Sequence, residues 1–279
     1  METEALVRGA QSDDNGATKK SCWTLRRLNL ALAAFQLATG VAMCVLADPD
    51  KAAPLYTHFA HVGAERTVAS QWPEARHVGK VSVGLLSGIF ILLSFADHFL
   101  VATFLYEPYK AAIKNGRNPF RWIEYSVSAP LMHVEIALLC GIYDVHTLFA
   151  IFGLTSITMA FGYLGEVAPK ESRVGVFLLG CVPHLYNWFI IACYFFRAVH
   201  YGNPPDFVWS IIFIIFAVDA SFGVVALAHA RGWKLCDCCG YGDLSKYRNV
   251  ELWYMALSIL AKQLLAWMQY WGIEGMRKE

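Results

Sequence analysis

The sequence predicts an all-α fold, a single bundle of seven transmembrane helices. Hydrophobic residues make up 57% of the chain and charged residues only 16%, and the mean hydropathy of +0.41 is too high for an ordinary soluble domain. Apolar runs of about twenty residues, the length that spans a bilayer as a helix, recur along the chain. A net charge of +1 provides no basic surface for a nucleic acid.

Each predicted helix corresponds to one apolar run. The runs lie at approximately 27–47, 78–105, 120–143, 147–168, 174–200, 207–230 and 249–272. A few residues around Asp144 separate the third run from the fourth, and only "APKES" separates the fourth from the fifth. Each of these pairs therefore predicts a tight helical hairpin.

The remaining segments are short or polar. The connection at 48–77 is long, aromatic and contains "RTVASQW", which favours a short pair of strands on the membrane surface. Residues 1–25 are polar and have no apolar core, which predicts a disordered tail and no cleavable signal peptide. We therefore expect one seven-helix domain at 26–273, followed by a short tail at 274–279.

The distribution of basic residues predicts the orientation of the bundle. Fifteen of the 23 Lys and Arg residues fall in the N-terminal segment and beside the connections that follow the second, fourth and sixth runs. Seven fall on the opposite side, and Lys262 lies within the last run. Because cytoplasmic segments carry the excess of basic residues, the N-terminus is predicted in the cytoplasm and the C-terminus outside.

The eight cysteines do not form the pattern of a secreted disulfide framework. Cys44, Cys140, Cys181 and Cys193 lie within apolar runs, whereas "CDCC" places three more at Cys236, Cys238 and Cys239. A zinc site usually has a second ligand pair at defined spacing, and none is evident here. Palmitoylation of this loop is the more favoured chemistry, and an unmodified reduced loop is favoured over both.

Lys262 lies in the middle of the last apolar run, "LWYMALSILAKQLLAWMQYW". An ammonium at that depth costs about 2.5–3.5 kcal/mol, so the chain must compensate for it. Lys262 is about thirteen residues, or ~20 Å, from the start of its helix, and its side chain leans back toward that end. Glu124, Ser94, His98 and Ser258 all fall roughly 10–14 Å from the same ends of their helices. These five side chains are therefore predicted to meet at one level.

Two interpretations of this group remain open on physical grounds alone. Lys262 and Glu124 form a buried ion pair in the first, although such pairs contribute little to stability. In the second, the desolvated amine is a nucleophile that forms a Schiff base with an aldehyde, and Glu124 is the counter-ion.

The chain resembles the heliorhodopsins, a family of retinal-binding seven-helix proteins whose N-terminus faces the cytoplasm. The similarity extends over all seven predicted helices, and its motifs are "SVGLLSGIFILLSFADH" at 82–98, "RWIEYSVSA" at 121–129, "SITMAFGYLGE" at 156–166 and "LSILAKQLLAW" at 257–267. The resemblance implies a bundle of rhodopsin type. It also implies that Lys262 carries covalently bound all-trans retinal, with Glu124 as counter-ion and a polar cavity formed by Ser94, His98 and Ser258.

A polyene cofactor requires a flat apolar wall, which aromatic and methionine side chains provide. The candidates for this wall are Met132, Met159, Phe161, Trp188, Phe213, Phe216 and Trp267.

Several residues depart from the family pattern. Gln36 stands where the family often has a histidine facing the same cavity. The third predicted helix also carries His133 and Glu135, and the sixth carries Asp219. Glu135 follows Glu124 by about three turns, with Ser128 between them on one face. Intramembrane acids often mark proton routes, but protonation or hydrogen bonding to a neighbouring helix is the more frequent explanation.

These observations leave three hypotheses of function. The family default is a light sensor with a slow photocycle, whose output reaches an unknown cytoplasmic partner without net ion pumping. The second is a light-gated proton route through Glu124, Glu135 and Asp219, with His133 beside it. The third is a seven-helix receptor or scaffold without a chromophore. Enzymatic motifs such as GxGxxG, the P-loop and HExxH are lacking, so we expect no enzyme.

The resemblance also implies that the protein binds a second copy of itself. A homodimer is expected, with the 48–77 segment and the surface of the fourth and fifth helices as candidate interfaces. A multi-pass protein of this composition resides in a lipid bilayer, and the plasma membrane is the default expectation.

Overall fold

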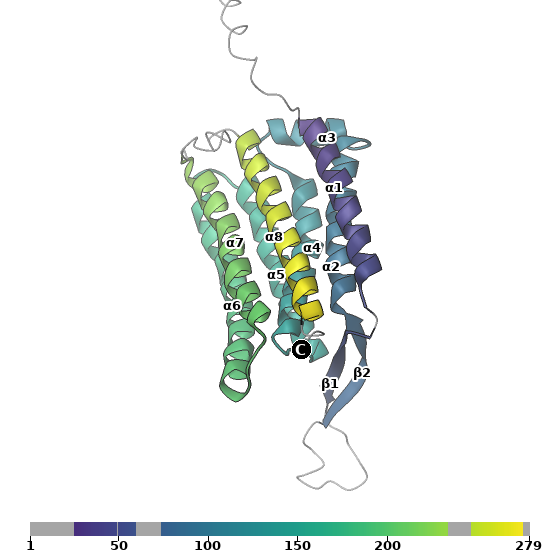
Figure 1. Ribbon diagram of the computed structural model, residues 1–279. Coiled ribbons are helices and arrows are strands. Elements are labelled where there is room, and N and C mark those ends of the chain that lie inside the picture. The colour runs from purple at the N-terminus through teal and green to yellow at the C-terminus, as the bar shows by residue number, and fades with distance from the viewer. Residues whose placement is uncertain (1–24, 49, 60–73, 234–246, 276–279) are drawn as a thin grey trace, which may run out of the picture.

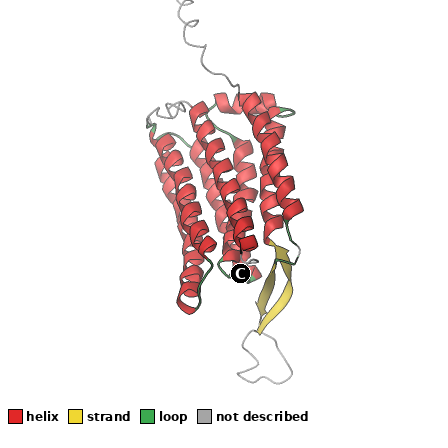
Figure 2. Cartoon of the chain, in the orientation of Figure 1, coloured by secondary structure: helices red, strands yellow, loops and turns green. Residues whose placement is uncertain are grey.

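The helical bundle predicted from the sequence is present in the computed structural model, which describes residues 25–48, 50–59, 74–233 and 247–275. Figure 1 shows long helices lying side by side, and Figure 2 shows that the strands form a separate arm at one end. The long helices are α1 (Leu25–Leu46), α2 (Val83–Ala102), α4 (Pro119–Leu139), α5 (Val145–Val167), α6 (Arg173–Tyr201), α7 (Asp206–Arg231) and α8 (Tyr247–Gly275). All seven predicted spans are therefore confirmed as helices.

Consecutive helices pack against one another around the bundle. Contacts join α2 to α4, α4 to α5, and so on to α7 and α8, while α8 packs back against α2 and closes the ring. Helix α1 packs along α2. By length and composition, α1, α2, α5, α6 and α7 are apolar enough to cross a membrane. The remaining two long helices, α4 and α8, carry Arg121, Glu135, Glu251 and Lys262, most of the charged side chains that are buried in the bundle.

A short helix that the sequence analysis did not predict lies between α2 and α4. This helix, α3 (Tyr106–Lys114), buries Tyr109 and Ala112 and exposes its charged residues. It lies across one end of the bundle, called here the α3 end (Figure 1). Helices α4, α6 and α8 begin at this end.

The opposite end carries the strand pair and is called here the hairpin end (Figure 1). Strands β1 (Ala52–Phe59) and β2 (Glu74–Ser82) are antiparallel, with an irregularity in register between Leu55 and Tyr56. The predicted strand pair is thus confirmed, although β2 extends into residues assigned to the second span. The quoted motif at 66–72 lies outside the described residues, as do the tail at 1–24 and the cysteines at 236–239.

The hairpin is fixed to the connection between α4 and α5. The Tyr56 backbone N–H donates to the Tyr143 carbonyl at 2.9 Å, and His58 Nδ1 lies 3.1 Å from Asp144 Oδ2. Asp144 also caps α5 by accepting from the Thr147 N–H at 2.8 Å. Partial burial acts to raise the pKa of Asp144, but the hydrogen bonds from His58 and Thr147 outweigh it and hold that pKa below its usual value.

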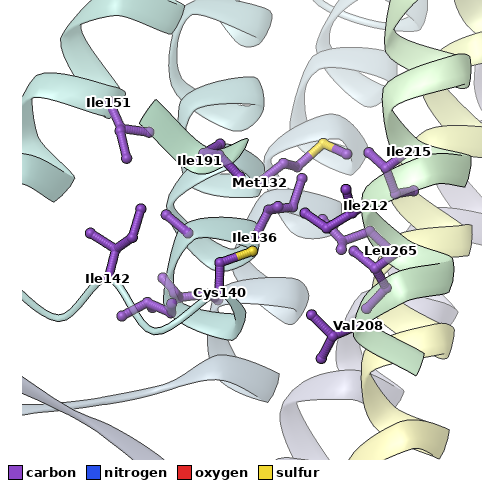
Figure 3. Close-up of a cluster of buried hydrophobic side chains, with 14 of the residues drawn as sticks. Met132, Ile136, Cys140, Ile142, Ile151, Ile191, Val208, Ile212, Ile215 and Leu265 are labelled. Atoms are coloured by element: carbon purple, nitrogen blue, oxygen red, sulfur yellow. The ribbon is translucent and has the colours of Figure 1, made fainter. Parts of the chain in front are cut away.

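The interior contains two apolar clusters that follow one another along the bundle. The aromatic cluster, toward the α3 end, contains Trp122, Tyr125, Tyr247, Tyr254 and Leu257. The aliphatic cluster lies further toward the hairpin end, and Figure 3 shows part of it between α4, α6, α7 and α8: Met132, Ile136, Ile191, Ile212, Ile215 and Leu265. On α8, Ser258 and Lys262 lie between Leu257 of the first cluster and Leu265 of the second.

Close packing of α4 against α5 depends on the glycine at position 162. A Cβ atom at Gly162 would lie 2.1 Å from the ring of Trp122, which is 8% exposed and held edge-on against Tyr125 and Tyr254. We expect Gly162→Ala to reduce the free energy of unfolding by about 1–3 kcal/mol, because a rigid indole cannot move away without repacking the cluster. Thermal unfolding of the purified protein measures this loss.

Gly153→Ala on the same helix is the matched control, because a Cβ atom there has no neighbour within 4 Å. Equal melting temperatures for the two variants would show that the contact between Gly162 and Trp122 does not limit the approach of the helices.

Candidate functional site

Lys262 forms the centre of a buried polar group made by three helices. Its side chain is 3% exposed, and its Nζ donates to Glu124 Oε1 on α4 at 2.9 Å. Nζ also contacts Ser94 Oγ on α2 and, at 3.1 Å, Ser258 Oγ one turn earlier on α8. Four of the five side chains predicted to share one level therefore meet within hydrogen-bonding distance.

Glu124 is held in place by a second contact. Ser94 Oγ donates to Glu124 Oε1 at 2.6 Å, so one carboxylate oxygen accepts from both the hydroxyl and the ammonium. The Tyr125 ring lies beside this pair, with its centroid 5.1 Å from Lys262 Nζ. A cation and a carboxylate in a low-dielectric interior attract strongly, which offsets part of the cost of burying Lys262.

His98 lies one turn beyond Ser94 and connects the site to the α3 end. Its Nδ1 lies 2.7 Å from Asn29 Oδ1 on α1, and no hydrogen bond among the described residues joins it to Lys262 or Glu124, so its predicted place in the polar cavity stays a prediction. The Asn29 amide lies 3.4 Å from the Tyr109 hydroxyl on α3, which donates to Glu251 Oε1 at 3.2 Å. A chain of buried side chains thus extends from beside the lysine to the short helix at the end of the bundle.

That chain ends in an ionic cluster that the sequence analysis missed. Arg121 at the start of α4 forms ion pairs with both Glu166 on α5 and Glu251 on α8. The guanidinium donates to the Tyr247 hydroxyl at 3.0 Å and lies 4.1 Å from the Tyr254 ring centroid. In the sequence, Arg121 is simply one of the basic residues beside the connection that follows the second run. Glu166 and Glu251, which are acids at the ends of apolar runs, were the available signal.

The predicted apolar wall is only partly assembled. Met132 and Trp188 are buried at 8% and 6% exposure, in the aliphatic cluster. Met159 packs on the aromatic cluster, and Phe161 is half-buried where α5 meets Gly180 of α6. Phe216 contacts Trp188 edge-on at 5.1 Å between centroids, although 45% of it is exposed.

Two members of the predicted wall need correction. Phe213 is 55% exposed and packs against Trp209 on the outside of α7, so it does not fit an enclosed wall. Trp267 donates from its indole to Gln263 Oε1 at 3.0 Å, and Gln263 in turn donates to Thr39 on α1. Trp267 is therefore on the side of α8 that faces α1 and not on the side of Lys262.

The three acids of the predicted proton route lie in separate groups. Glu124 pairs with Lys262, whereas Glu135 accepts from Ser87 on α2. Asp219 accepts from the Trp188 indole at 2.8 Å and lies 3.4 Å from His133 Nε2 and 3.5 Å from His184 Nε2. Among the described residues, no hydrogen bond joins one of these groups to another, and the proton route stays a prediction.

The described cysteines, Cys44, Cys140, Cys181 and Cys193, are free, as the sequence pattern indicated.

The fold is that of the seven-helix rhodopsins, and Lys262 lies buried within its last helix. The structure is similar to that of thermophilic rhodopsin from Rubrobacter xylanophilus, with a TM-score of 0.62 and 12% identity over 89% of this chain and 94% of that one. It is also similar to a light-driven proton pump from Leptosphaeria maculans, with a TM-score of 0.59 and 12% identity over 91% and 94% of the two chains. At such low identity these similarities establish the fold alone.

The family follows from the sequence model that matches residues 25–273, which is that of heliorhodopsin. The chain belongs to the heliorhodopsin family. It is an integral membrane protein and a retinal-based light sensor. A search of curated protein sequences finds no match.

The residues present fit a retinal chromophore. A primary amine with an adjacent carboxylate provides both the attachment atom for an aldehyde and the charge that balances a protonated imine. Ser128 Oγ is buried on the same helix as Glu124 and has no hydrogen-bond partner among the described residues. The same is true of both polar atoms of the Gln36 side chain, at the position where the family often has histidine. Ser128 follows Glu124 by one turn of α4, so its unpartnered hydroxyl is available to a further group or a water molecule on that face of the helix.

Proposed function

We propose that the protein is a light sensor in which Lys262 Nζ carries all-trans retinal as a protonated Schiff base with Glu124 as its counter-ion. The single observation that supports this most is the buried contact of 2.9 Å between Lys262 Nζ and Glu124 Oε1 in the middle of the bundle. Retinal bound there would supply visible-light absorption and isomerisation of a double bond.

The side chains around Nζ have distinct roles in this proposal. Glu124 Oε1 balances the positive charge on Nζ and is the nearest carboxylate that can accept its proton. Ser94 Oγ contacts both partners and holds Glu124 in line with the amine. Ser258 Oγ, 3.1 Å from Nζ, fixes the lysine side chain from its own helix. Such a cluster responds to a change at Nζ by rearranging its hydrogen bonds.

The chain of contacts toward the α3 end supports an output on that side. A slow photocycle would alter His98, Asn29 and Tyr109 in turn and so displace α3, which a cytoplasmic partner could recognise. The proposed orientation, with the N-terminus in the cytoplasm, places α3 at the inner face. The described basic residues support it, because Arg26, Lys110, Arg117, Arg173 and Arg231 all lie near the α3 end. A homodimer in the plasma membrane completes the proposal.

The test is to express the protein with all-trans retinal, record its visible spectrum and then follow it after a flash. We expect a visible band, a slow recovery and no light-dependent pH change in a suspension of illuminated cells. A sustained pH change or current that disappears in Glu135→Gln or Asp219→Asn would show that the protein transports protons. It would contradict a signalling role without ion transport. A folded protein without a visible band would contradict the chromophore and favour a receptor or scaffold.

A further inference from the structure

A second buried carboxyl group lies in the half of the bundle toward the hairpin end. Glu135 is fully buried on α4, about 16 Å along the helix from Glu124 by the rise per residue. Ser87 on α2 is also fully buried beside it, and Gln269 on α8 is 3% exposed. These three residues, Glu135, Ser87 and Gln269, are called here the Glu135 site.

The hydrogen bonds of the Glu135 site favour a protonated carboxyl group. Ser87 Oγ lies 2.9 and 2.8 Å from the two carboxyl oxygens of Glu135, and 3.5 Å from Gln269 Oε1. One hydroxyl has a single proton to donate, and all three neighbours are acceptors when Glu135 is ionised. If Glu135 holds a proton, its O–H donates to Ser87 Oγ, and the Ser87 hydroxyl donates to Gln269 Oε1.

The charged side chains of the bundle also favour a protonated Glu135. Glu124 pairs with Lys262, Glu166 and Glu251 pair with Arg121, and Asp219 lies beside two histidines. Glu135, by contrast, has no Lys, Arg or His within ion-pair distance in the part of the chain that the structure describes. A carboxylate without a cation is costly in such an interior, whereas the neutral acid is not.

The neighbours of the Glu135 site on each packed helix are neutral or directed elsewhere. From α2 the facing group is Ser87, and from α8 it is Gln269. On α4 itself, His133 donates from Nδ1 to the Ala129 carbonyl and faces Asp219, and Cys140 is a buried free thiol. On α7, Asp219 pairs with this histidine and with His184.

Gln269 connects the Glu135 site to a small cavity at the hairpin end. The cavity has a volume of about 20 Å³ and is lined by the ends of α1, α2 and α8, together with Asp48 and Lys51. One water molecule needs roughly 10–15 Å³, so the cavity has room for a water next to the amide. Water bonded to the Gln269 amide can approach Ser87, whose hydroxyl passes a proton to or from the carboxyl group.

We propose that Glu135 is a proton-binding site that is neutral at rest and exchanges its proton with the medium at the hairpin end through Ser87 and water that Gln269 holds in this cavity. The site is independent of the proposed chromophore linkage, because it shares no side chain with Lys262 or Glu124. It gives this protein a buried titratable acid toward the hairpin end, separate from Glu124 beside Lys262.

Infrared spectroscopy of the purified full-length protein in an ester-free detergent tests this directly. We expect a C=O stretch of a protonated carboxylic acid that shifts when the protein is transferred to D₂O and is absent in Glu135→Gln. Ser87→Ala should move the same band, because the carboxyl group loses its hydrogen-bond partner, and this variant replaces Glu135→Gln if the latter does not fold. Gln269→Leu should slow the exchange by roughly tenfold, the factor that corresponds to one lost hydrogen bond.

The matched control is Gln263→Leu, which removes an amide from the same helix on the side that faces α1. Its exchange should equal that of the unmodified protein. A band unaffected by both Glu135→Gln and Ser87→Ala would show that Glu135 is ionised, and equal exchange in Gln269→Leu and Gln263→Leu would contradict the path. Neither result depends on the visible band. A result that contradicts the proton-binding site is therefore distinct from one that contradicts the proposed chromophore.

Discussion

A Lys262→Ala variant expressed with all-trans retinal is expected to show no visible absorption band. The methyl group of alanine cannot form an imine, and the described structure places no second lysine beside Glu124. The loss should be complete and not graded, because a covalent attachment is either present or absent. Parallel visible spectra of the two purified proteins, normalised to protein concentration, provide the measurement.

Folding must be separated from attachment in this experiment. Removing Lys262 leaves Glu124 buried without its cation, so the variant is also expected to be less stable. Lys110→Ala is a suitable control, because Lys110 is exposed, contacts only its own helix through Glu107 at 3.7 Å and the Tyr106 ring among the described residues, and should retain the full band. A helical, monodisperse Lys262→Ala protein with an undiminished band would place the chromophore elsewhere.

A Glu124→Gln variant is expected to lose its visible band at a lower pH than the unmodified protein. The visible band belongs to the protonated imine, so it is present at low pH and disappears as the pH rises through a midpoint. Removing one partner of a buried ion pair costs about 3–5 kcal/mol, and 1.36 kcal/mol corresponds to one pH unit. The midpoint should therefore fall by roughly two to four pH units. A spectrophotometric pH titration measures it.

Glu124→Asp is the matched variant, since it keeps the negative charge and shortens the side chain by one methylene group. Its midpoint should lie much closer to that of the unmodified protein. Identical midpoints for the unmodified protein and Glu124→Gln would mean that another group is the counter-ion and that the contact at 2.9 Å is structural.

The sequence could predict the height of each site residue along the bundle. Helical rise converts residue number into height, and Ser94, Glu124, Ser258 and Lys262 do meet at one level. The seven helices were equally predictable, because each apolar run has the length of a bilayer. The rotation of each helix about its axis was not predictable, since it depends on how neighbouring side chains pack. Phe213 and Trp267 are turned away from the site for this reason.

Short and polar features were also missed. Helix α3 has only nine residues and a mixed composition, so its sequence resembles a loop. The ionic cluster of Arg121 joins residues that lie 45 and 130 positions apart in the chain, and no local pattern reveals such contacts. The likeness to the heliorhodopsins, by contrast, could be recognised from motifs around Glu124 and Lys262 and was confirmed by the match over residues 25–273.

The most direct test of the account is to identify the lysine that carries the chromophore. Borohydride reduction of the purified coloured protein converts an imine into a stable amine, after which proteolysis and mass spectrometry locate the added retinyl group. The account predicts one modified peptide, containing Lys262. A retinyl group on another lysine, or a coloured protein that yields no modified peptide, would contradict it.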